Sequence, residues 1–144
     1  MKCRELMCGD WLANKYGTPM QITDVGDDYA NANEYGNEDV VVEFDDKYIK
    51  PYPIPLKEVI LKKNGWIVHS LTLPNNIEEY YYVKDKSTNH LIWNKGTLSI
   101  WLNYEKDNDG VYSDIVIPVK YVHQLQQVLR IAGMTDMANN FIVI

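Results

Sequence analysis

Three histidines are the residues of this 144-residue chain best suited to acid–base or metal chemistry. They stand at His69, His90 and His123, and no two of them have the spacing of an HExxH or His-x-x-x-His segment. The sequence therefore does not join them into one site, and structural or surface roles account for them most simply. A site assembled only in the folded chain stays open as an alternative.

A calcium loop is the second chemistry that the residue pattern raises. Glu105, Asp107 and Asp109 occupy the first three ligand positions of an EF-hand, and Gly110 takes the position of the bend. The twelfth position needs a bidentate acid, but it falls on Val116 inside a predicted strand. We therefore expect a solvated hairpin turn here and no bound calcium.

Nucleophilic catalysis and phosphate binding have no recognisable motif in the chain. The serines lack a G-x-S-x-G context, and neither GxGxxG nor GxxxxGK[ST] occurs. A disulfide between Cys3 and Cys8 would close a very small loop, so we expect two reduced thiols and a cytoplasmic protein. We predict no catalytic residue, no metal and no cofactor. An enzyme or small-molecule binder with a site not visible in the sequence is the alternative.

Aromatic residues offer a binding face. The chain has 11 Tyr, 4 Trp and 2 Phe, and Tyr80–Tyr82 lie close in sequence to Trp93 and Trp101. Such rings suit ordinary sheet packing, a protein-contact patch, or base stacking by a single-strand binder. The formal net charge of −6 counts against nucleic acid, because binding to phosphates draws on clustered Lys and Arg.

A polar ridge is expected on the last predicted helix, over residues 120–132. His123, Gln127 and Arg130 recur at i, i+4 and i+7, opposite an apolar stripe that includes Val122 and Leu125. The ridge is interpreted either as a solvated face or as a surface that binds a partner. The candidate partner contacts are therefore Tyr82, Trp101, His123, Gln127 and Arg130.

Short strands must position these residues. Alternation and β-branched content predict strands over 9–14, 20–25, 40–44, 66–73, 79–84, 90–94, 97–104 and 111–119. Asp27–Glu38 is polar and rich in Asn, which predicts a long, mobile hairpin loop. Three prolines within Pro51–Pro55 indicate a connector, and a short helix follows it to Lys63. The apolar tail Phe141–Ile144 is expected to dock as a last strand.

These elements predict an α+β fold. We expect an N-terminal small β-barrel, SH3-like, over residues 1–53, and an α+β subdomain over 54–144. The second part contains the short helix, an antiparallel meander sheet and a packed C-terminal helix. No run of about 18 apolar residues occurs, so no membrane span is expected.

Four segments together carry a resemblance to a known family. They are, in order, Arg4–Trp11, Ile49–Leu56, Leu61–Trp66 and Tyr121–Gln126, of which the Pro53–Leu56 and Tyr121–Gln126 parts are the most specific. The chain resembles a family of small uncharacterised proteins of gut anaerobes and their phages or mobile elements. The resemblance implies an accessory protein of such an element and supplies no catalytic residues.

No motif assigns a function, so three hypotheses stand at this point. The first is a non-enzymatic protein-interaction or accessory module with an unidentified protein partner. The second is a nucleic-acid-binding accessory protein, and the third is the enzyme or small-molecule binder described above. A homodimer is also possible, because sheets that end in an apolar strand often pair.

Overall fold

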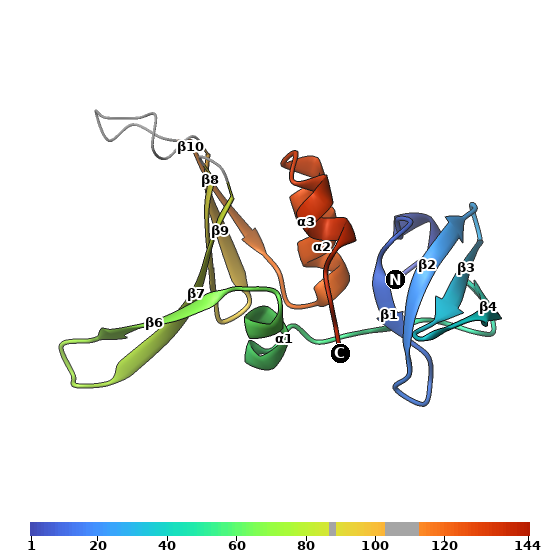
Figure 1. The fold of residues 1–144 in the computed structure, drawn as a ribbon, viewed down its shortest axis with the longest axis horizontal. Helices are drawn as coiled ribbons and strands as arrows, with labels where there is room; N and C mark the ends of the chain where they lie inside the picture. Colours follow the sequence, from blue (N-terminus) through green and yellow to red (C-terminus); the bar gives the residue numbers. More distant parts are fainter. Residues whose placement is uncertain (87–88, 103–112) are drawn as a thin grey trace. The chain divides into compact units, whose positions relative to one another are not determined.

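The computed structural model describes residues 1–86, 89–102 and 113–144 of the chain (Figure 1). These residues form two compact units. Unit 1 consists of Met1–Pro55 and Tyr121–Val143, and unit 2 consists of Leu56–Lys120 and Ile144. Each unit is described by itself below.

Unit 1 contains a five-stranded antiparallel sheet. Its strands are β1 (Trp11–Ala13), β2 (Pro19–Val25), β3 (Tyr29–Glu34), β4 (Asn37–Asp45) and β5 (Tyr52–Pro53), arranged in the order β4-β3-β2-β1-β5. A register shift between Ile22 and Asp24 marks a bulge in the pairing of β2 with β3. Within residues 1–55 no pairing joins β4 to β5, so the predicted SH3-like closed barrel is not confirmed.

One face of this sheet builds an apolar core with the N-terminal turn η1 (Cys3–Glu5). The buried side chains of the cluster are Cys3, Leu6, Leu12, Met20, Ile22, Ala30, Ala32 and Phe44. Burial is the main cause that raises the pKa of the Cys3 thiol to about 11, and a hydrogen bond to Asp46 adds to the effect. The thiol is therefore protonated at neutral pH. Cys3 and Cys8 are both free thiols.

The predicted mobile loop over Asp27–Glu38 is wrong. Residues 29–34 form the interior strand β3, which pairs with β2 and β4. A tight turn containing Gly36 in the left-handed region leads into β4. Ala30 and Ala32 are fully buried, while Asn31 and Asn33 alternate with them. The strand was not predicted because its buried positions hold small alanines where strands usually have β-branched residues. Large side chains of neighbouring strands fill the core next to these alanines.

The C-terminal helices α2 (Val122–Ile131) and α3 (Thr135–Asn139) also belong to unit 1, where α2 contacts β1. The predicted helix and its buried stripe of Val122, Leu125 and Leu129 are confirmed. This arrangement differs from the predicted division at residues 53 and 54, because the chain returns to its first unit for the last helices. The predicted terminal strand is wrong, since residues 141–144 do not form a strand in the described part of the chain.

Unit 2 contains the second five-stranded antiparallel sheet and one short helix, α1 (Glu58–Lys63). Its strands are β6 (Ile67–Thr72), β7 (Glu78–Lys86), β8 (Asn89–Asn94), β9 (Thr97–Leu102) and β10 (Ser113–Pro118), each paired with the next in the order β10-β9-β8-β7-β6. Leu91, Leu98 and Ile100 are buried on one face of the sheet. The predicted antiparallel meander and α+β class are thus confirmed.

Among the residues described, no helix has the length and apolar character that crossing a membrane requires.

The burial of Ala32 gives a first prediction. Ala32 lies between Ile22 on β2 and Val42 on β4, so Ala32→Leu overpacks the core of unit 1. We expect its free energy of unfolding to fall by about 1–3 kcal/mol. Asn33→Leu is the matched control on the other face of β3, with an expected change within about 0.5 kcal/mol. Urea denaturation measures both, and equal losses would contradict the placement of Ala32 in the core.

Candidate functional site

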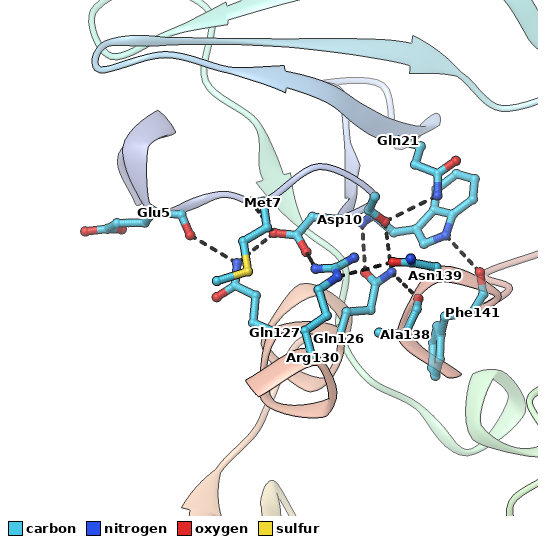
Figure 2. A network of polar contacts seen from close by, with 12 residues as sticks. Glu5, Met7, Asp10, Gln21, Gln126, Gln127, Arg130, Ala138, Asn139 and Phe141 are labelled. Atoms are coloured by element: carbon cyan, nitrogen blue, oxygen red, sulfur yellow. Dashed lines mark hydrogen bonds and ion pairs between the residues drawn. The ribbon is translucent and has the colours of Figure 1, made fainter. Parts of the chain in front are cut away.

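A buried carboxylate is the centre of the polar network in unit 1 (Figure 2). Asp10 is fully buried at the entry to β1, and three donors reach its two oxygens. The Met7 backbone N–H donates to Oδ2 at 2.9 Å, Gln127 Nε2 donates to Oδ2 at 2.7 Å, and Arg130 Nη1 donates to Oδ1 at 2.5 Å. Charge-assisted bonds of this kind compensate for the removal of the carboxylate from water.

Local geometry on both sides brings these groups together. Gly9, with a φ of +91°, turns the chain just before Asp10. A side chain there would collide, because a Cβ atom on Gly9 would lie 2.8 Å from Arg130 Nη2. On α2, Gln127 and Arg130 are three residues apart and therefore project from the same side of the helix.

Gln126 and Trp11 extend the network to the end of the chain. The Trp11 backbone N–H donates to Gln126 Oε1 at 2.9 Å, and Gln126 Nε2 donates to the carbonyl oxygens of Gly9 and Ala138. The Trp11 indole donates to the carbonyl of Phe141 at 2.9 Å. The Trp11 side chain thus anchors the apolar tail at Phe141.

The predicted polar ridge faces inward in unit 1. His123 is buried, Gln127 donates to Asp10 and to the carbonyl of Glu5, and Arg130 pairs with Asp10. Because both Asp10 oxygens accept hydrogen bonds, the arrangement works as a structural crosslink and leaves no free base for proton transfer. That these three residues contact a partner stays a prediction.

His123 is the least satisfied member of the ridge. Its Nδ1 atom is buried and has no hydrogen-bond partner among the residues described. Burial lowers the pKa of His123, and the nearby carboxylates of Asp10 and Glu5 oppose this effect. His123 also lines a pocket of about 390 Å³ with Glu5 and Lys50, but neither His69 nor His90 reaches this pocket.

The second candidate surface is the face of the unit 2 sheet opposite Leu91, Leu98 and Ile100, which we name the open face. Strand alternation and register place on it the carboxylates of Glu79 and Asp85 together with a set of uncharged and histidine side chains. That set includes Ile67, His69, Leu71, Tyr81, Val83, His90, Ile92, Ser99, Trp101 and Val116. Ile67, Leu71 and Val116 are 64%, 54% and 61% exposed.

Two cross-strand ring pairs lie on the open face. His69 stacks on Tyr81 with ring centroids 5.4 Å apart, and His90 lies 5.1 Å from Trp101 in a tilted arrangement. His90 Nδ1 also contacts the carboxylate of Asp85. Each of these two histidines therefore packs against an aromatic ring within the sheet. His69 and His90 belong to different ring pairs.

Trp101 and Tyr82 fall on opposite faces of this sheet. Trp101 is partly exposed on the open face. Tyr82 is buried on the core face, with its ring centroid 5.9 Å from that of Trp93. Burial is the main cause that raises the pKa of Tyr82, and a hydrogen bond to Glu58 adds to the effect. The sequence did not distinguish them, because three consecutive tyrosines occupy both faces of β7.

The structure shows no group of three potential metal ligands within residues 1–86, 89–102 and 113–144. The hairpin turn predicted at Asp107–Gly110 lies outside the described residues.

Comparison with known proteins found no matching family model, no matching curated protein and no matching solved structure. The resemblance to small proteins of gut anaerobes and their mobile elements therefore stays a prediction.

The Asp10–Arg130 pair gives a second prediction. Arg130→Met leaves a buried carboxylate without its cation, which we expect to lower the free energy of unfolding by about 3–5 kcal/mol. Adding Asp10→Asn to this variant removes the orphaned charge and is expected to restore part of the loss. Urea denaturation of the single and double variants measures this coupling.

The exposed pair of Lys62 with Glu58 provides the control for that experiment. Lys62→Met is expected to change the free energy of unfolding by less than about 1 kcal/mol, because exposed ion pairs contribute little. A loss from Arg130→Met no larger than this would contradict the crosslinking role of Asp10.

His123 gives a third prediction, on pH dependence. Because its pKa is lower in the folded chain than in the unfolded chain, protonation favours unfolding. The free energy of unfolding is expected to fall as the pH decreases below about 6.5, by up to about 1.4 kcal/mol per pH unit. Stability curves between pH 5 and 7 should be flatter for His123→Gln than for the wild type. Parallel curves for the wild type and His123→Gln would count against this assignment.

Proposed function

We propose that this protein is a non-enzymatic interaction module that binds a partner protein on the open face of unit 2. One observation carries the proposal: Ile67, Leu71 and Val116 are exposed on the same face of one sheet, beside two ring pairs. Exposed apolar residues that share one sheet face with polar neighbours are typical of protein-binding surfaces.

The composition of the open face supports a protein partner in particular. Tyr81 and Trp101 are aromatic residues of the type enriched at interfaces, where one side of the ring is apolar and its tip is polar. Of the charged residues next to them, Glu79 is paired with Lys95, and Asp85 contacts the ring of His90. Among the described side chains the centre of the face is therefore mainly apolar, which favours its desolvation by another protein.

Charge also limits the kind of partner. The chain carries a formal net charge of −6, so its field attracts a surface with Lys and Arg around an apolar centre. The same charge disfavours nucleic acid, which needs a basic stripe. We propose that the module acts in the cytoplasm, and its two free thiols support a reducing compartment.

Val116 provides the fourth prediction. Val116→Asp places a charge on the open face, whereas Val41→Asp makes the same change at an equally exposed valine of unit 1; the two are 61% and 62% exposed. Each purified variant is immobilised and exposed to nuclease-treated lysate of the source cells. We expect the wild type and Val41→Asp each to retain one protein in stoichiometric amount. The amount retained by Val116→Asp should be about tenfold lower.

The retained protein is then purified and titrated against the same three chains by calorimetry. A dissociation constant raised by Val116→Asp and unchanged by Val41→Asp supports the proposal. Equal binding by both variants, or a species that nuclease removes, would overturn it.

A further inference from the structure

The outer edge of β6 is an unpaired strand edge at the end of the unit 2 sheet. All six residues of β6 are exposed, and within residues 1–86, 89–102 and 113–144 the strand pairs only with β7. The Leu73 N–H donates to the carbonyl of Ile77, which continues the register of the β6–β7 ladder. Because hydrogen-bonded pairs alternate in an antiparallel ladder, the backbone groups of Val68, Ser70 and Thr72 point outward.

In the described part of the chain, the other three sheet edges carry features that discourage pairing. β4 contains Asp39, Glu43 and Asp45 and has a register shift against β3. β5 is only two residues long and ends in Pro53, and β10 contains Asp114 and ends in Pro118. Charges, prolines, bulges and short length are the ordinary ways in which proteins block strand edges.

β6 has none of these features. Its sequence, Ile-Val-His-Ser-Leu-Thr, contains no acidic residue, lysine, arginine, proline or glycine, and its pairing with β7 runs without a register shift over six residues. An edge of this length that lacks any protection pairs readily with another strand. The contrast with β4, β5 and β10 within one chain indicates that this edge is kept available.

The β6–β7 hairpin also lacks a third strand over part of its length. β8 pairs with Tyr82–Lys86, so among the described residues Glu78–Tyr81 pair only with β6. Leu71, Ile77 and Tyr80 are each more than half exposed in this region. A two-stranded ribbon is marginally stable in water, and a third strand along β6 would stabilise it.

We propose that a second copy of this chain occupies the edge, with β6 pairing antiparallel to β6 of the other copy about a two-fold axis normal to the sheet. This axis keeps each face of the sheet on its own side, so Ile67, His69 and Leu71 of one copy lie opposite the same set in the other. Val68, Ser70 and Thr72 likewise meet their own set on the core face.

Self-pairing suits this strand better than pairing with a different protein. A strand with no charged residue opposes itself without like-charge repulsion, which is the main obstacle to symmetric pairing. A different partner strand would be selected in part by charges along the edge, and β6 contains no Asp, Glu, Lys or Arg. The result is a continuous sheet made from two five-stranded sheets, with the two open faces joined across the axis.

The oligomeric state of the purified chain tests this proposal. At about 100 µM, a pair with a micromolar dissociation constant is almost wholly dimeric. We expect sedimentation equilibrium to give twice the 16.7 kDa mass of the chain. Leu71→Lys on β6 should raise the dissociation constant about tenfold or more, since lysine blocks strand edges. Val116→Lys on β10 is the control, because Val116 has a similar exposure on the same face. It should change the dissociation constant of the dimer by no more than about twofold.

Hydrogen exchange provides a readout that needs no variant. The amides of Val68, Ser70 and Thr72 should exchange more slowly in concentrated than in dilute solution, while other amides of β6 keep their rates. A 16.7 kDa species at the higher concentration, equal weakening by the two lysine variants, or exchange independent of concentration at these three amides would each overturn the proposal. These measurements use purified protein, so they are separate from the test of the partner surface.

Discussion

Asp10 is a fully buried carboxylate whose side-chain donors come from the other end of the chain. Removing such a group from water is costly unless its oxygens accept good hydrogen bonds, and Gln127 and Arg130 provide them. This requirement fixes the position of α2 on β1, and Gln126 then reaches Gly9, Trp11 and Ala138 from the same helix. The turn at Gly9, the helix α3 and the anchored tail all depend on this contact.

Much of the fold followed from local patterns, whereas the polar network did not. Alternating β-branched residues predicted the strands of unit 2, and the stripe of Val122, Leu125 and Leu129 predicted α2. β3 was missed because its buried residues are alanines that alternate with asparagines, and asparagine is typical of turns. Local composition carries little information on a strand whose neighbours supply the bulk of the core.

The candidate site was predicted in part for a related reason. The helical spacing predicted one polar ridge of His123, Gln127 and Arg130. A polar helix face is ordinarily interpreted as solvent-exposed unless a buried acid is known to lie opposite it. Asp10 lies more than a hundred residues away and has no unusual sequence context. The alternation within one strand is enough to separate Trp101 from the buried Leu98 and Ile100. Three consecutive tyrosines, in contrast, leave the orientation of Tyr82 open until its pairing with Trp93 on β8 is known.

The discontinuity of unit 1 has a consequence for synthesis on the ribosome. Residues 1–55 emerge first, but the helices that complete their unit are the last part of the chain to be made. At about 5–20 residues per second, Arg130 follows Asp10 by roughly 6–24 s. During this interval the aspartate remains hydrated and the first sheet lacks its helical cover. The nascent chain therefore cannot complete its first unit until translation is nearly finished, and truncated products are left with an incomplete core.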